Sequence, residues 1–221
     1  MEVACDHGQS YELQAGATAL LCIDYQTDFL SDQGICAARG LPVASLARIV
    51  TPSRNVLSAA RRKRLTVVHV RECYEPDLSD LNAFRRARDT IIGAPGPLGR
   101  FLLRNERGTE IVPEMAPLAS EPVLDKPGFN AFYNTPLDDL LRKHGITHLV
   151  LMGITTQCCV ASTLRGAVDH GYFPLLLADC CAAWDAQDHE ASVRVIFSEN
   201  HQFGWVSDSA RLLQAIVNTT E

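Results

Sequence analysis

An apolar run followed by a helical pattern is the feature that most constrains how this chain folds. Residues 149–153 (Leu-Val-Leu-Met-Gly) are apolar and end in a glycine, as a buried strand does. Polar turn residues follow, and from Val160 onward apolar residues recur at helical spacing. The pattern predicts a strand, a turn and a helix, with the thiol of Cys159 at the junction. Open α/β sheets place their chemistry at such junctions, outside the carboxyl ends of their strands.

The same alternation of strands and helices runs along most of the chain. Apolar or β-branched runs predict strands at residues 18–24, 65–70, 121–125, 148–153 and 173–179. Helical periodicity predicts helices at residues 45–64, 136–144, 159–170, 187–198 and 208–217. Strands that alternate with helices predict an α/β fold, a Rossmann-like three-layer α/β/α sandwich around a mostly parallel central sheet. We expect a single domain over residues 1–221, because the chain has no internal repeat, low-complexity tract or linker.

Residues 74–114 interrupt this alternation. The segment is irregular, holds several glycines and prolines, and shows one short helical pattern near residues 81–88. Long irregular loops in compact domains are usually lids or binding loops. We therefore expect a lid-like excursion here.

Composition excludes several classes of function. The chain has a formal net charge of −6 and no basic stripe of the kind that binds nucleic acid. No apolar run is long enough to cross a bilayer, and the first residues lack the pattern of a secretory signal. The eight cysteines are spaced neither as a disulfide framework nor as Cys-x-x-Cys pairs. We expect a cytoplasmic protein with reduced thiols and a small-molecule partner, binding neither nucleic acid nor membrane.

Three reactive side chains are expected at three strand ends. Asp24 closes the first strand, Lys126 closes the short strand after the excursion, and Cys159 follows the central strand. Because the carboxyl ends of parallel strands share one edge, these residues can converge. Each residue alone also fits an ordinary role, as a turn aspartate, a solvated lysine or a buried cysteine. Spacing alone leaves both interpretations open.

Together the three side chains could perform acyl transfer. Lys126 would favour the thiolate of Cys159, which is the nucleophilic form. Asp24 could accept the thiol proton and deliver it to a leaving amine. Backbone N–H groups of the turn could hold the oxyanion. These residue types therefore indicate hydrolysis through a thioester intermediate.

Three ordered motifs resemble those of the isochorismatase-like cysteine hydrolases, and the resemblance covers nearly the whole chain. The motifs are residues 23–29 (Ile-Asp-Tyr-Gln-Thr-Asp-Phe), 125–128 (Asp-Lys-Pro-Gly) and 153–160 (Gly-Ile-Thr-Thr-Gln-Cys-Cys-Val). The resemblance implies that Asp24, Lys126 and Cys159 form a catalytic triad in which Cys159, not Cys158, is the nucleophile. It also implies a cis peptide before Thr155, whose N–H would join that of Cys159 in an oxyanion hole.

Further motifs resemble the biuret-hydrolase branch of this family. They lie at residues 71–72, 76–81, 96–100, 179–181 and 203–204. The resemblance implies an amidohydrolase that cleaves the terminal C–N bond of a small linear ureide, triuret or biuret, and releases ammonia. It implies no cofactor, and a homodimer or homotetramer. Zinc-dependent nicotinamidases carry an Asp-x-His pair that this chain lacks, so we expect no metal site.

Four residues are candidates for substrate contact. Phe29 follows the family's Asp-Phe pattern and could wall the pocket, and Asn130 could bind a ureide carbonyl. Arg86, like Arg100, lies in or beside the excursion, where it could meet a polar substrate. Glu199 stands where biuret hydrolases carry a glutamine. Because an ionised glutamate only accepts hydrogen bonds, this exchange favours the N–H-rich triuret over biuret.

Two other functions remain open. One is hydrolysis of another small amide, such as ureidoacrylate, a maleamate or an N-carbamoyl amino acid. Those substrates carry a carboxylate, so a well-placed arginine in the excursion would favour them and Glu199 disfavours them. The other is a catalytically silent binding module, which the intact set of Asp24, Lys126 and Cys159 disfavours.

Overall fold

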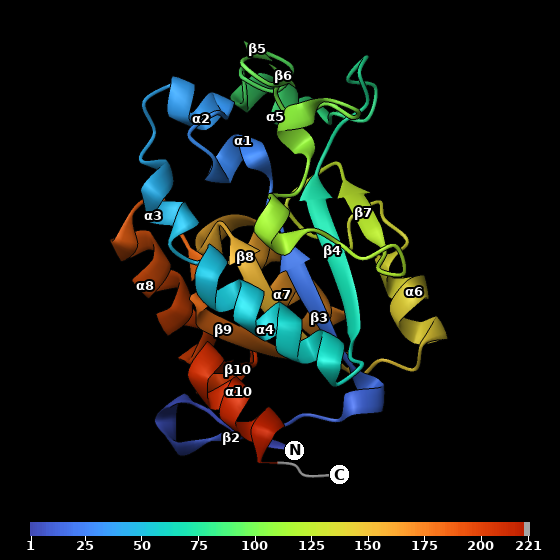
Figure 1. Cartoon of the computed structure of the whole chain (residues 1–221), viewed down its shortest axis with the longest axis vertical. Coiled ribbons are helices and arrows are strands. Elements are labelled where there is room, and N and C mark those ends of the chain that lie inside the picture. Colours follow the sequence, from blue (N-terminus) through green and yellow to red (C-terminus); the bar gives the residue numbers. More distant parts are fainter. Residues whose placement is uncertain (219–221) are drawn as a thin grey trace.

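One six-stranded sheet forms the centre of the computed structural model, which describes residues 1–218. Its strands are β3 (Thr18–Ile23), β4 (Thr66–Glu72), β7 (Val123–Lys126), β8 (His148–Ile154), β9 (Phe173–Ala182) and β10 (Trp205–Ser207). They lie in the order β10-β9-β8-β3-β4-β7, and every neighbouring pair is parallel (Figure 1). The parallel sheet confirms the predicted α/β class.

Helices cover both faces of this sheet and complete the three layers. One face carries α4 (Val50–Arg62) and α10 (Ser209–Val217), and the other carries α6 (Leu137–Lys143), α7 (Ala161–Asp169) and α8 (Ala186–Ile196). Side chains of β3 alternate between the two apolar clusters, with Leu20 in one and Leu21 in the other. A strand buried on both faces needs apolar residues at every position, which explains the continuous run in the sequence. None of the helices over residues 1–218 is long and apolar enough to span a membrane.

Several short elements were not predicted from the sequence. They are an antiparallel hairpin of β1 (Glu2–Ala4) and β2 (Ser10–Glu12), the helices α1 (Thr27–Leu30), α2 (Ile35–Ala38) and α9 (Ser198–His201), and strand β10. The helix predicted over residues 45–64 is divided into α3 (Val43–Ala47) and α4. The helix expected to begin at Cys159 also differs. Residues Thr156–Val160 form one π-helical turn, and the α-helix begins only at Ala161. π-Helical turns are rare in proteins, and those that occur often lie at functional sites.

The order in which strands are added to the sheet reverses at β3. The chain passes from β3 to β4 and on to the edge strand β7, then returns to β8 on the opposite side of β3. In open α/β sheets, ligands bind at this switch point, outside the carboxyl ends of the strands. The fold therefore predicts a ligand site at the residues that follow β3 and β8.

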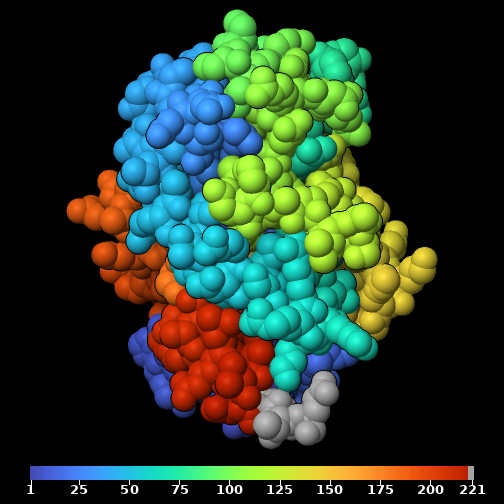
Figure 2. Space-filling view, viewed as in Figure 1, coloured from blue at the N-terminus to red at the C-terminus, as the bar shows by residue number. Residues whose placement is uncertain are grey.

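The excursion between β4 and β7 is packed rather than loose. It contains α5 (Ala83–Arg88), the strand pair β5 (Pro95–Gly96) and β6 (Gly99–Arg100), and the turns η3 (Arg107–Thr109) and η4 (Pro113–Met115). Tyr74, Ile92 and Phe101 share a small apolar cluster with Ile35 of α2. Figure 2 shows this green segment beside the blue helices α1–α3, at the end of the molecule opposite the red α10.

Candidate active site

Four neighbouring strands each place one reactive side chain at the same edge of the sheet. Asp24 follows β3, Glu72 ends β4, Lys126 ends β7, and Cys159 lies in the turn after β8. The parallel register sets Glu72 directly beside Lys126. Residues far apart in the sequence therefore meet because their strands are neighbours.

The three residues singled out in the sequence lie in contact. The Lys126 Nζ atom is 2.9 Å from an Asp24 carboxylate oxygen and 3.4 Å from the Cys159 sulfur. It also donates to the carbonyl of Gly128 at 2.9 Å. The exposed fractions are 0 % for Lys126, 1 % for Asp24 and 5 % for Cys159. In this low-dielectric setting their charges act strongly on one another.

The backbone around Asp24 fixes the direction of its carboxylate. Asp24 has a left-handed backbone conformation with φ +57°, which turns the chain sharply at the end of β3. Its Oδ1 atom accepts from the backbone N–H of Glu72 at 2.8 Å. The Gln26 side chain accepts from the same N–H and donates to the carbonyl of Glu72, each at 2.9 Å. The second carboxylate oxygen is then left for Lys126. Asp24 is thus held by the neighbouring strand before any substrate binds.

Glu72 is a buried member of the site to which the sequence analysis gave no role. Its Oε1 atom accepts from Arg85 at 2.7 Å and from the Tyr74 hydroxyl at 2.8 Å. Its Oε2 atom lies 4.0 Å from Lys126 Nζ and 3.8 Å from the Cys159 sulfur. The predicted strand stopped at residue 70, two positions short. The missed signal was an acid at the end of a β-branched strand, the same signal that indicated Asp24.

Burial and neighbouring charges shift the pKa values of Cys159, Asp24 and Lys126. The hydrogen bond of Cys159 with Cys158, its burial and the carboxylate of Asp24 raise the pKa of Cys159 well above its ordinary value, and Lys126 only partly opposes them. Lys126 therefore favours the thiolate, as expected, but the other groups around the thiol oppose this effect. Burial likewise raises the pKa of Asp24, against the effect of Lys126. Burial alone would lower the pKa of Lys126, but Asp24, Cys159 and Glu72 raise it, so the side chain stays an ammonium.

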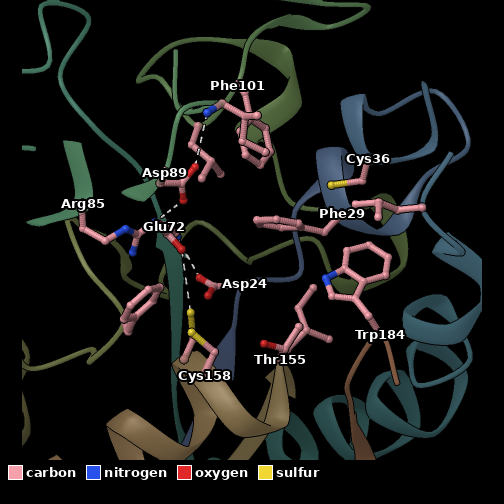
Figure 3. A pocket seen from close by; sticks show the side chains of 16 residues that line it. Asp24, Phe29, Cys36, Glu72, Arg85, Asp89, Phe101, Thr155, Cys158 and Trp184 are labelled. Atoms are coloured by element: carbon pink, nitrogen blue, oxygen red, sulfur yellow. Dashed lines mark hydrogen bonds and ion pairs between the residues drawn. The ribbon is translucent and has the colours of Figure 1, made fainter. Parts of the chain in front are cut away.

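A cavity of about 190 Å³ is lined by Asp24, Cys158 and Cys159. Figure 3 shows Asp24 and Cys158 at this cavity. Phe29 and Trp184 form the opposite wall, and Thr155 lies beside the cysteines. The excursion contributes further lining residues, namely Arg85, Asp89, Ile91, Phe101 and Leu102. The excursion therefore forms one wall of the cavity.

Three predicted substrate contacts do not reach this cavity. Asn130 accepts from the backbone N–H of Phe132 and packs against Gly166 of α7. Arg86 is exposed and donates to backbone carbonyls within the excursion. Glu199 is exposed beyond the end of α8, where residues 199–201 have positive φ and turn the chain away. Glu199 therefore gives no preference for triuret over biuret.

Arg85, the neighbour of Arg86, is the arginine that does line the cavity. It lies four residues after the buried Leu81, on the inward face of α5, and is itself only 5 % exposed. The side chain of Asn82 caps α5 by accepting from the backbone N–H of Arg85. The position of the cap sets which arginine faces inward, and the sequence analysis did not use it.

Two further features concern the turn after β8 and the charge of the site. The peptide bond between Ile154 and Thr155 is cis, as the family resemblance implied.

The oxygens of Asp24 and Glu72 and the sulfur of Cys159 lie within 4.8 Å of one another, a spacing that could hold a metal ion. The Lys126 ammonium, however, already lies against all three groups and supplies the positive charge there.

The switch point of this parallel sheet holds a thiol, a carboxylate and an ammonium in contact, an arrangement typical of a hydrolase. The model of the Isochorismatase domain matches residues 18–211, and the chain belongs to that family. It is similar to ureidoacrylate amidohydrolase RutB of Serratia proteamaculans, with 33 % identity over 86 % of this chain and 79 % of that protein. RutB of Cronobacter turicensis is 32 % identical over 90 % and 88 % of the two chains.

Solved structures share the fold. A cysteine hydrolase from Pseudomonas syringae superposes with a TM-score of 0.82 at 27 % identity, covering 94 % of this chain and 96 % of the other. N-carbamoylsarcosine amidase from Thermoplasma acidophilum gives a TM-score of 0.68 at 27 % identity, covering 87 % and 96 %.

Proposed function

We propose that this protein is a cysteine amidohydrolase that cleaves the terminal amide of a small ureide and releases ammonia. The observation that carries the proposal is the contact of Asp24, Lys126 and Cys159 beside a small cavity. Membership of the Isochorismatase family and the likeness to amidohydrolases support it. A binding module would have no need of this contact among three buried ionisable groups.

The first half-reaction forms a thioester. Asp24 takes the proton from Cys159 while the sulfur attacks the terminal carbonyl carbon, and Lys126 balances the negative charge that develops. The N–H groups of Thr155 and Cys159 bind the oxyanion. Asp24 then returns the proton to the leaving nitrogen, the C–N bond breaks, and ammonia departs.

The second half-reaction releases the acyl group. Water enters the place that ammonia left and loses a proton to Asp24 as it attacks the thioester carbon. The C–S bond breaks, the proton passes to the Cys159 sulfur, and a carbamic acid leaves. Lys126 supplies the positive charge that balances the oxyanion and the thiolate in both half-reactions, so we propose that no metal takes part.

The substrate class follows from a shared chemical group. The compounds in the names of the similar proteins, ureidoacrylate and N-carbamoylsarcosine, carry a carbamoyl group on nitrogen, as biuret and triuret do. Among the cavity residues, Arg85 is the cation, and it is already paired with Glu72 and Asp89. A substrate carboxylate would therefore meet two protein carboxylates beside that arginine. This charge balance favours a neutral ureide, such as biuret or triuret, over ureidoacrylate.

An ammonia-release screen tests the proposal directly. We expect turnover of biuret or triuret, slower turnover of ureidoacrylate and N-carbamoylsarcosine, and none of nicotinamide. Asp24→Asn keeps the acceptor for the Glu72 N–H but cannot take a proton, so it should lose roughly 10²–10⁴-fold in rate. A preference for ureidoacrylate would establish the alternative substrate. Absence of ammonia from every carbamoyl compound would overturn the proposed function.

A further inference from the structure

We infer that Glu72 and Arg85 form a recognition pair that selects ureides with a second carbonyl next to the terminal carbamoyl group. The inference rests on the proposed function and names the residues that set its substrate class. Arg85 would act as a specificity-determining residue, and Glu72 would contact both the substrate and Arg85.

Arg85 has hydrogen-bond donors without a partner among the described residues. Its Nη2 atom donates to Glu72 at 2.7 Å and to Asp89 at 3.0 Å. Its Nε and Nη1 atoms are buried and have no hydrogen-bond partner among residues 1–218. Buried polar groups in native proteins nearly always have a partner, and each exception needs an explanation. Because Arg85 lines the cavity, an acceptor on the substrate supplies that explanation.

The guanidinium is held rigidly enough to discriminate between ligands. It lies 4.0 Å from the centre of the Phe129 ring, and Glu72 and Asp89 hold one of its nitrogens. Figure 3 shows Arg85 turned toward Glu72 at the side of the cavity. A planar guanidinium fixed on one nitrogen presents its remaining donors in a set direction.

Glu72 stands between the nucleophile and Arg85. One of its oxygens is 3.8 Å from the Cys159 sulfur, and the other accepts from Arg85. A substrate with its terminal carbonyl at the sulfur therefore extends past Glu72 before it reaches Arg85. The protein presents first an acceptor and then a donor along this path.

An acylureide, H₂N–CO–NH–CO–R, matches that order. Its bridging N–H follows the carbonyl that is attacked and can donate to Glu72. Its second carbonyl comes next and can accept from Nη1 or Nε of Arg85. In an N-alkyl ureide such as N-carbamoylglycine, a CH₂ group occupies this second position and leaves the arginine donors unpaired. Sites built to hydrogen-bond a substrate group reject analogues that lack it.

The test compares two substrate classes in the wild type and in matched variants. The acylureides are biuret and N-acetylurea, and the N-alkyl ureides are N-ethylurea and N-propylurea, which are also neutral and keep the bridging N–H. Arg85→Lys keeps a cation for Glu72 but removes the fork of donors, and Arg88→Lys makes the same exchange at an exposed position of the same helix. Melting curves of both variants verify that they are folded.

We expect the wild type to prefer acylureides. Arg85→Lys should lower kcat/KM for acylureides by about 10–100-fold, mainly through KM, and change the N-alkyl ureides by less than about threefold. Arg88→Lys should match the wild type. An equal loss for both classes would overturn the inference, because it would show that Arg85 only supports Glu72. A wild-type preference for N-alkyl ureides would overturn it without any variant.

A binding measurement separates this inference from the proposed function. Calorimetric titration of N-acetylurea and its neutral CH₂ analogue N-ethylurea into Cys159→Ala needs no turnover. Tighter binding of N-acetylurea that is lost in Cys159→Ala/Arg85→Lys supports the recognition pair even if no ammonia is ever released. Equal affinity for the two compounds in Cys159→Ala contradicts it.

Discussion

The ammonium of Lys126 lies 3.4 Å from the sulfur of Cys159, and both side chains are buried. The same ammonium is 2.9 Å from Asp24. One cation therefore balances a carboxylate and also the atom on which negative charge forms during attack. Lys126 lowers the pKa of Cys159, so in the proposed mechanism this charge stabilises the thiolate that forms when the proton moves to Asp24.

Replacing Lys126 should damage both activity and stability. Lys126→Met leaves the Asp24 carboxylate buried without its partner, which typically costs about 3–5 kcal/mol. We expect the rate to fall by at least about 10²–10³-fold, since a charge that stabilises the transition state is lost. Urea unfolding and ammonia release measure the two effects. Lys143→Met, at an exposed end of α6, is the control and should behave as wild type. A stable and active Lys126→Met would refute this account of the charge balance.

The acid limb of the pH–rate profile should report Asp24. Burial raises the pKa of Asp24 above its ordinary value, Lys126 opposes the rise, and Glu72 adds to it. Because Asp24 must be ionised to accept the thiol proton, kcat/KM should fall as the pH drops through this raised pKa. Glu72→Gln removes a neighbouring negative charge, so its limb should move to lower pH. A limb that stays in place or moves upward would show that another group controls it.

Gly153 should be intolerant of a side chain. It has φ +137°, and a Cβ atom there would lie 2.0 Å from the carbonyl oxygen of Ile23 on β3. Gly153→Ala combines backbone strain with a clash between central strands, and we expect a loss of about 2–5 kcal/mol. Gly171→Ala is the matched control, because Gly171 also has positive φ but open space around its Cβ position. Equal melting temperatures for the two variants would contradict the steric argument.

A second charged cluster, remote from the cavity, should affect stability alone. Glu121 accepts two hydrogen bonds from Arg61 and contacts the buried His69. Burial raises the pKa of Glu121, but these partners lower it by more, so the pKa stays below its ordinary value. The stabilisation is therefore present above the unfolded-state pKa and is lost as the pH falls through the lower folded-state pKa. Glu121→Gln should cost about 1–3 kcal/mol at pH 7. The cost should shrink in acid, with unchanged kcat. A cost that does not depend on pH would contradict the assignment.

The sequence predicted the strands that carry the site better than the groups around the cavity. β3 and β8 are buried on both faces, so their apolar runs are unmistakable, and the residues that follow them had to meet at one edge. β10 has three residues and, among the described strands, pairs with β9 alone, so its pattern is too short to detect.

Residues outside the strands depend on geometry that no pattern records. Arg85 and Arg86 differ only by the phase of a short helix, which its cap at Asn82 decides. Glu199 was misplaced because residues 199–201 adopt a left-handed conformation that non-glycine residues seldom take. Glu72 is buried as a charged residue, which becomes understandable only once Lys126 and Arg85 are seen beside it.

The proposed mechanism requires that Cys159, and not the adjacent Cys158, attacks the substrate. Cys158 also lines the cavity, but Cys159 is the one in contact with Lys126. The most direct measurement is ammonia release from biuret or triuret by Cys159→Ala and Cys158→Ala at equal concentration. We expect no detectable turnover from Cys159→Ala and a rate within about tenfold of wild type from Cys158→Ala. Undiminished ammonia release from Cys159→Ala would contradict the proposed mechanism.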